Sequence, residues 1–83
     1  MLRRTEVTIG GQTWVFTTER IGADPVTGEE EYETTIAPPC TDVAKPARRC
    51  LTQQRAHQVH QMFVDEFVAT AHGHADINSY PQN

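Results

Sequence analysis

The stretch EVTIGGQTWVF, residues 6–16, decides the fold of this 83-residue chain. Two short runs of alternating residues flank Gly10 and Gly11, and a pair of glycines supplies the positive φ angles that type I′ and II′ turns require. The stretch therefore predicts a β-hairpin. Its register pairs Val7 with Trp14, Thr5 with Phe16 and Ile9 with Gln12. Because strand side chains alternate between faces, the hairpin has an apolar face made of Val7, Ile9, Trp14 and Phe16.

A third strand is predicted over EEEYETTI, residues 29–36. The stretch before it, IGADPVTGEE, is rich in turn-forming residues and favours an irregular turn. Within the strand, Tyr32, Thr34 and Ile36 alternate with Glu31, Glu33 and Thr35, so one face is partly apolar and the other is acidic and hydroxylic. Pro38 and Pro39 have no N–H to donate to a neighbouring strand, and they are expected to end it.

Residues 52–73 have the pattern of one amphipathic helix. Thr52 is the expected N-cap, and Gly73 is expected just past the C-terminus, with His72 near the last carbonyl groups. At 100° per residue, one arc of the helix collects Ala56, Val59, His60, Phe63, Phe67 and Ala71, with Val64 beside them. This arc is expected to cover the apolar face of the sheet.

These elements predict an α+β fold, in which a three-stranded antiparallel sheet, the hairpin plus the third strand, packs against one C-terminal amphipathic helix in the order βββα. Residues 1–75 are expected to form a single domain. Residues 40–51 are predicted to be a charged linker without periodicity, and residues 76–83 a loosely held C-terminal tail.

One helix covers only one face of such a sheet. The far face is expected to carry Thr8, Thr13, Val15, Thr17, Glu33 and Thr35. Antiparallel sheets commonly expose one face to water, so a solvated face is one interpretation. The other is that this face, or an unpaired edge, docks a partner protein or a second copy of the chain.

The formal net charge is −4, and acidic residues gather between Glu19 and Glu33. This sign argues against a nucleic-acid binder, which needs Lys and Arg to neutralise phosphates. No apolar run approaches the roughly 20 residues that cross a bilayer, so a cytoplasmic protein without membrane contact is expected. Cys40 and Cys50 are then expected to be free thiols.

A zinc site would require Cys40, Cys50, His57 and His60 to converge, and thiolate and imidazole are suitable zinc ligands. The spacing fits poorly, because structural zinc sites usually present their cysteines as a close C-x₂₋₄-C pair. An alternative for His60 is packing against the sheet, with one ring nitrogen bonded to a carbonyl group. For His72 and His74, an interaction with the helix end is the alternative to metal binding.

Nucleophilic catalysis would pair Cys50 or Cys40 with a nearby histidine, and Cys50 lies just ahead of a helix N-terminus that can lower the pKa of a thiol. No third residue or oxyanion loop accompanies it, and so small a domain offers little room for a water-excluding pocket. The sequence therefore predicts a non-enzymatic protein without a cofactor.

YETTIAPP, residues 32–39, followed by TQQRAHQVHQMFVDEF, residues 52–67, resembles a pattern of small accessory proteins of tailed phages and prophages. In that pattern a Y-E-T-apolar strand precedes a helix that opens with A-x-x-G-H. The matching positions are Tyr32, Glu33, Thr34, Ile36, Ala56, His60 and Phe63, while Val59 stands in place of the usual glycine. The resemblance implies a short accessory phage protein of unknown activity, and for a phage-encoded protein the expected cytoplasm is that of the host cell.

The preferred hypothesis is a protein-binding module that docks on a host or phage protein and modulates or inhibits it. Its expected binding residues are an acidic segment, Glu29, Glu30, Glu31 and Glu33, and part of the open sheet face, Thr13, Val15, Thr17 and Thr35. The alternatives are a zinc-stabilised module and a structural or assembly protein that works as a homo-oligomer, such as a homodimer.

Overall fold

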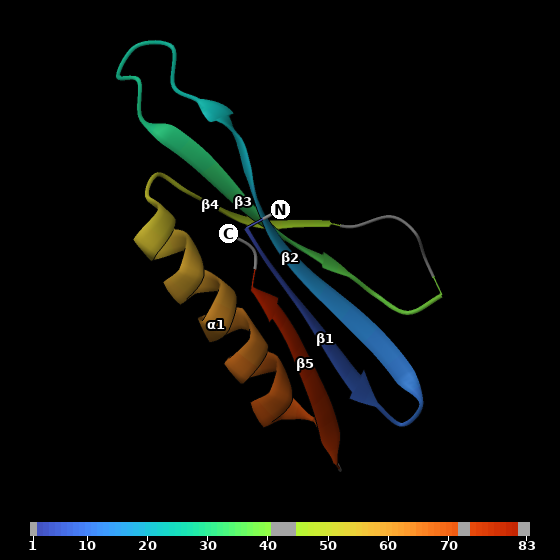
Figure 1. Cartoon of the computed structure of the whole chain (residues 1–83). Helices are drawn as coiled ribbons and strands as arrows, with labels where there is room; N and C mark the ends of the chain where they lie inside the picture. The colour runs from blue at the N-terminus through green and yellow to red at the C-terminus, as the bar shows by residue number, and fades with distance from the viewer. Residues whose placement is uncertain (1, 41–44, 72–73, 82–83) are drawn as a thin grey trace.

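The computed structural model describes residues 2–40, 45–71 and 74–81, and within them it contains one sheet and one helix (Figure 1). The elements are β1 (Arg3–Ile9), β2 (Gln12–Ala23), β3 (Glu30–Ala37), β4 (Lys45–Cys50), α1 (Gln53–Thr70) and β5 (Ala75–Pro81). The strands lie in the order β4-β3-β2-β1-β5, and all four pairings are antiparallel. The predicted α+β class with an antiparallel sheet and one helix is therefore confirmed, but the sheet has five strands where three were expected.

The first hairpin has the predicted register, with Val7 opposite Trp14, Thr5 opposite Phe16 and Ile9 opposite Gln12. Gly10 and Gly11 form its turn with φ angles of 59° and 79°. Positive φ at both central residues defines a type I′ turn, which matches the twist of the two strands. A side chain at either glycine would be strained in this conformation.

Residues 45–50, expected to be linker, form strand β4 against β3. The stretch KPARRC has no apolar alternation, and Pro46 disfavours a central strand. β4 is an edge strand, where a proline is tolerated, and the pairing shifts register between Thr34 and Thr35. Cys50 at its end lies opposite Tyr32, and both side chains are buried.

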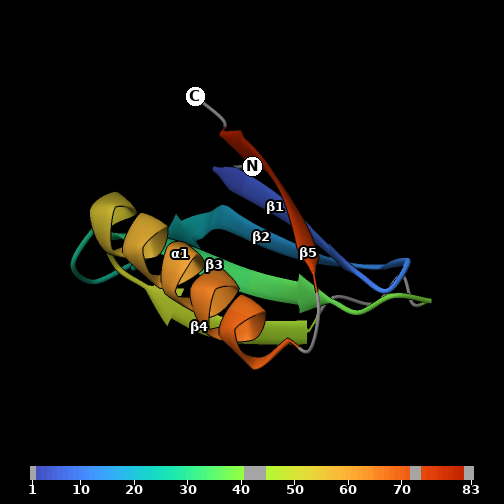
Figure 2. The ribbon, with the colours of Figure 1, turned by 90° about the horizontal axis from the view of Figure 1, so that it is seen from below.

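Residues 75–81, which overlap the expected tail, form strand β5 against β1. The predicted boundary between residues 75 and 76 therefore falls inside a strand. Asp, Asn, Ser and Pro are frequent in turns, and this stretch is rich in them, so its composition did not predict a strand. Figure 2 shows β5 beside β1 at one side of the sheet, with α1 lying over the other strands.

The core lies between α1 and the sheet. One cluster contains Tyr32, Cys50, Ala56 and Val59, and a second contains Val7, Phe16 and Val64. Phe67 packs in the second cluster, with its ring centroid 5.1 Å from that of Trp14 and 5.5 Å from that of Phe16. The predicted apolar arc of the helix is thus the buried arc.

Helix α1 begins as predicted, because the Thr52 side chain accepts a hydrogen bond of 3.1 Å from the backbone N–H of Arg55. It ends at Thr70, and Ala71 is its C-cap. The predicted capping roles of His72 and Gly73 lie outside the described residues. In the described part of the chain, no helix is long and apolar enough to cross a membrane.

Candidate functional site

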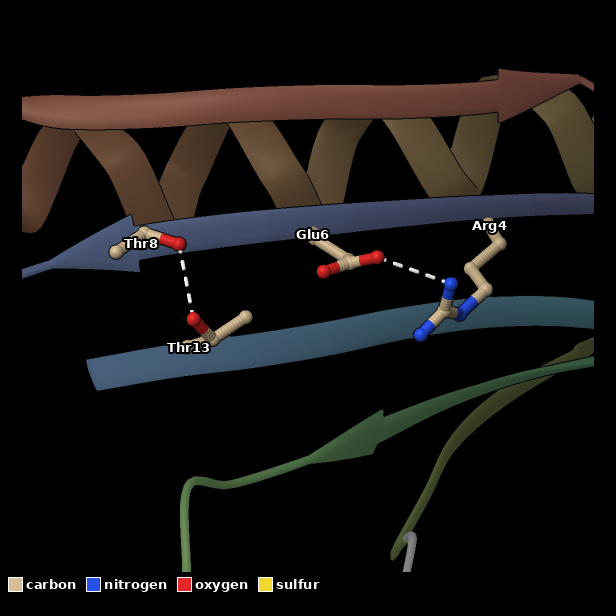
Figure 3. A network of polar contacts seen from close by, with 4 residues as sticks. All are labelled: Arg4, Glu6, Thr8 and Thr13. Atoms are coloured by element: carbon tan, nitrogen blue, oxygen red, sulfur yellow. Dashed lines mark hydrogen bonds and ion pairs between the residues drawn. The ribbon is translucent and has the colours of Figure 1, made fainter. Parts of the chain in front are cut away.

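The sheet has an open face on the side opposite α1. Figure 3 looks onto this face and shows Arg4, Glu6, Thr8 and Thr13 in front of the strands, with the helix behind them. An Arg4 guanidinium nitrogen lies 2.9 Å from a carboxylate oxygen of Glu6, and the hydroxyl oxygens of Thr8 and Thr13 are 2.9 Å apart. No described element covers these side chains, so the face is available for contact with another molecule.

The four sheet residues predicted for partner binding alternate with buried core residues, which places them on this open face. Thr13, Val15 and Thr17 lie on β2 and Thr35 lies on β3, and all four are half-buried. Thr17 and Thr35 are direct cross-strand neighbours, and the Thr35 hydroxyl lies 3.5 Å from the Thr17 carbonyl oxygen. Together they make the centre of the face hydroxylic with one aliphatic side chain.

The charges of the open face are mainly negative. Alternation along the strands places the carboxylates of Glu6, Glu19, Glu31, Glu33 and Asp76 there, against the guanidinium groups of Arg4 and Arg49. Glu19 lies directly opposite Glu33 across β2 and β3, and like charges in this position destabilise a sheet. Arg49 on β4 binds Glu33 at 3.2 Å, while no described side chain pairs with the Glu19 carboxylate. The face therefore carries uncompensated negative charge.

The predicted acidic segment begins with Glu29 in the turn that joins β2 and β3 and continues into β3 with Glu30, Glu31 and Glu33. This turn projects beyond the first turn of α1 (Figure 1). Two exposed apolar side chains occur in the same hairpin: Val26 at the turn is 90% exposed, and Ile21 is 42% exposed. Ile21 is the extra residue of an irregularity in the pairing between Arg20 and Gly22. Bulges of this kind redirect side chains and increase the local twist. The hairpin end thus combines exposed apolar and acidic groups.

A network of hydrogen bonds fixes the shape of this turn. One carboxylate oxygen of Asp24 accepts hydrogen bonds from the backbone N–H groups of Val26 (2.7 Å) and Thr27 (3.0 Å). These bonds stabilise the ionised form and lower the pKa of Asp24. The backbone of Asp24 also donates to Glu29 (2.8 Å) and accepts from Gly28 (2.9 Å). The backbone that carries the Val26 side chain is therefore held by hydrogen bonds within the turn.

The four glutamates of the acidic segment have different surroundings. Glu30 lies 3.4 Å from Arg20 and accepts a hydrogen bond from the Tyr32 hydroxyl, an interaction that raises the pKa of Tyr32. Glu33 is bound by Arg49. No described side chain pairs with the carboxylates of Glu29 and Glu31. Of the predicted set, these two retain the most free charge.

The four candidate zinc ligands do not form a site. Cys40 is exposed, whereas Cys50 is buried among apolar side chains, and both are free thiols. Over residues 2–40, 45–71 and 74–81, no three His, Cys, Asp or Glu side chains come together to hold a metal ion. Both ring nitrogens of His60 contact threonine hydroxyls and face no cysteine. We did not predict from the sequence that threonine hydroxyls bind both ring nitrogens of His60.

The His60 cluster consists of four buried polar residues: Thr5, Thr18, Thr34 and His60. The Nε2 atom of His60 lies 2.8 Å from the Thr5 hydroxyl, and its Nδ1 atom lies 2.7 Å from the Thr18 hydroxyl. Thr18 is in turn 2.7 Å from Thr34. Burial, together with the positive charges of Arg3 and His57, lowers the pKa of His60 from 6.5 to about 4. A neutral ring that binds β1 and β2 directly, and β3 through Thr18, has a structural role.

The signal for this cluster was present in the sequence. Thr5, Thr18 and Thr34 each lie two positions from a buried residue of the same strand, which places them on the inward face. A histidine within the apolar arc needs polar partners when it is buried. The partners of His60 are inward-facing threonine hydroxyls. The expected partner was a backbone carbonyl group.

Comparison with protein-family models, with curated proteins and with solved structures gave no match to this chain.

Proposed function

We propose that this chain is a non-enzymatic protein-binding module that docks on a host or phage protein and modulates or inhibits it. The observation that carries the proposal is the end of the β2–β3 hairpin. This end of the hairpin contains the exposed side chains of Val26 and Ile21 and the carboxylates of Glu29 and Glu31, with which no described side chain pairs. We call these four residues the hairpin tip.

The chemistry of the hairpin tip selects one kind of partner. A valine that is 90% exposed at a convex turn can lose most of its contact with water only by entering a concave apolar site. The flanking carboxylates favour Lys or Arg around that site, because complementary charges speed encounter and set orientation. The partner is therefore a protein with an apolar pocket bordered by basic side chains.

The ordered turn supports a role in binding. Hydrogen bonds to the carboxylate and backbone of Asp24 hold the turn before any partner arrives. A loop that is already in its bound shape loses less conformational entropy on association.

The open sheet face is the second part of the proposed surface. Its excess of carboxylates, with Glu19 unpaired beside Glu33, fits the same basic partner. Thr13, Val15, Thr17 and Thr35 would provide hydrogen-bonding groups and a small apolar contact. Of the acidic segment, Glu30 and Glu33 already hold Arg20 and Arg49, and their proposed role is to order the surface.

The phage origin is supported by the sequence resemblance of residues 32–36 and 56–63. A reducing compartment such as the host cytoplasm fits the free thiols of Cys40 and Cys50. The proposal includes both, and neither is needed for the surface chemistry described above.

The proposal is tested by affinity capture from bacterial lysate, followed by binding measurements with the purified captured protein. The first variant, Glu29→Lys/Glu31→Lys, reverses the free charges. The second, Val26→Asp, removes the apolar anchor. The control, Asp65→Lys/Glu66→Lys, makes the same change in net charge on the exposed side of α1, away from the hairpin tip.

We expect the charge-reversed variant to bind more slowly and with less dependence on salt, because it lacks the attraction to a basic surface. Val26→Asp should weaken the complex at least about tenfold, which corresponds to about 1.4 kcal/mol. The control should bind as the parent does. Equal binding by all four proteins would refute the role of the hairpin tip. A captured partner whose contact site is acidic would refute the proposed chemistry.

A further inference from the structure

The two edges of the sheet differ in how they are protected against pairing with another strand. β4 and β5 are the edge strands, and the edge of a sheet presents unpaired N–H and C=O groups (Figure 1). Natural proteins block such edges with Lys or Arg side chains, with proline, or with irregular pairing.

The β4 edge has all of these protective features. The strand is KPARRC, in which Pro46 cannot donate a hydrogen bond, and Arg48 and Arg49 are exposed. Its pairing with β3 is interrupted by a register shift between Thr34 and Thr35. Another strand would meet positive charge, a missing donor and an irregular backbone along this edge.

The β5 edge lacks them over most of its length. The strand is ADINSYP, which contains no Lys or Arg, and its only proline is the last residue. Its pairing with β1 is continuous, from Ile9 opposite Ala75 to Arg3 opposite Pro81. Ile77 in the middle of the strand is 48% exposed. A regular edge with an exposed apolar residue can accept a further strand.

Ile77 is exposed because the helix does not reach it. Ile77 lies directly opposite Val7, so it is on the helix side of the sheet, where Val7 is completely buried. The contacts of α1 are mainly with β1, β2, β3 and β4. Figure 2 shows β5 diverging from the helix along its length. Among the described residues, no element covers the exposed part of Ile77.

We propose that a second copy of this chain covers it, through antiparallel pairing of β5 with β5. In a register centred on Ile77, Ile77 lies opposite Ile77 of the second copy, and Asp76 lies opposite Asn78. The two isoleucines then contact each other, and each carboxylate faces an amide. A register centred on Asp76 would set two carboxylates against each other, and like charges there are unfavourable.

The pairing is self-limiting. A twofold β5–β5 contact uses the same edge on both copies and closes the assembly as a dimer. Pairing of β4 with β5 would instead continue into a filament, and the protection of β4 opposes it. The dimer has one continuous ten-stranded sheet, with both helices on one side and both open faces on the other. This inference does not depend on the proposed partner chemistry.

The first test is the molar mass of the purified full chain over a wide range of concentrations, by light scattering and sedimentation. We expect a reversible shift from the monomer mass to twice that mass. Ile77→Lys places two ammonium groups at the centre of the contact and should raise the dissociation constant at least about tenfold. Arg48→Glu, on the opposite edge, should leave it unchanged. Circular dichroism establishes that both variants are folded.

The second test locates the contact. In a Cys40→Ser background, Ile77→Cys should form an intermolecular disulfide on mild oxidation, because paired residues in antiparallel strands have Cα atoms within disulfide range. Arg48→Cys in the same background should not. A monomer at every concentration would overturn the inference, and so would a dimer that tolerates Ile77→Lys and crosslinks no better at 77 than at 48.

Discussion

The Nδ1 atom of His60 lies 2.7 Å from the hydroxyl oxygen of Thr18, and this contact joins the middle of α1 to the central strand of the sheet. Thr5 binds the other ring nitrogen from β1, and Thr34 binds Thr18 from β3. No buried side-chain nitrogen or oxygen in the described residues lacks a hydrogen-bond partner. The cluster therefore fixes the position of the helix by polar contacts, whereas apolar packing alone tolerates small shifts.

The folded protein is expected to lose stability in acid because of His60. In an unfolded chain the ring takes up a proton at a pKa near 6.5, but the folded protein resists this until about pH 4. Between these values the unfolded state binds more protons, so the free energy of unfolding rises with pH over this range and levels off above about 6.5. The difference corresponds to about 3 kcal/mol. Urea unfolding at a series of pH values measures it.

His60→Gln removes the titrating ring and should abolish most of this slope between pH 4 and 6.5. His57→Gln, on the half-buried flank of the same helix, is the matched control and should retain it. If the two variants show the same pH dependence, the slope does not originate at His60.

Thr18→Val should destabilise the protein by about 1–3 kcal/mol, because it leaves the Nδ1 atom of His60 and the Thr34 hydroxyl without their shared partner. Thr17→Val makes the same chemical change at the neighbouring residue, on the open face, and should alter stability by less than about 0.5 kcal/mol. Thermal and urea unfolding compare the two. Similar effects at both positions would contradict the importance of the buried cluster.

Phe67→Ala should destabilise the protein by about 3 kcal/mol, since the ring packs against both Trp14 and Phe16. Trp14 is the only tryptophan, so its fluorescence should shift to longer wavelength while the chain is still folded. Met62→Ala removes a side chain of the exposed helix surface and should change neither quantity appreciably. An unchanged emission spectrum in folded Phe67→Ala would show that the two rings are apart in solution.

Thr52→Ala should cost about 1 kcal/mol, because the backbone N–H of Arg55 loses its acceptor at the start of α1. Thr52→Ser keeps the hydroxyl group and should preserve stability to within a few tenths of a kcal/mol. Chemical unfolding of both variants measures the difference. Equal destabilisation by alanine and serine would point to the methyl group of Thr52 as the important feature.

Local sequence patterns were sufficient for the elements whose geometry depends on near neighbours. The Gly10-Gly11 pair determines the turn and hence the register of β1 and β2. The 3.6-residue period of α1 identified its buried arc, and Thr52 identified its start. Each of these features depends on residues within a few positions of one another, and a single sequence records such relationships well.

The edge strands could not be predicted in the same way. β4 and β5 have little apolar alternation, and each exists because a neighbouring strand supplies hydrogen-bonding partners. The sequence also did not show which glutamates of the acidic segment form ion pairs. Glu30 and Glu33 bind arginines that come from other strands. The orientation of the His60 ring depends on threonines of two other elements, β1 and β2, which are far from it in the sequence. Such contacts arise from the tertiary fold, which overrides local preference.

The pairing of β1 with β5 gives the folding of this protein a defined order. It joins Arg3 to Pro81, so it closes a loop that includes nearly the whole chain and carries the highest contact order in the sheet. We therefore expect β5 to join after the hairpins and the helix have formed. During synthesis on a ribosome, the outer edge of β1 stays unpaired until residue 81 has emerged. In that interval the unpaired edge of β1 makes the nascent chain prone to aggregation.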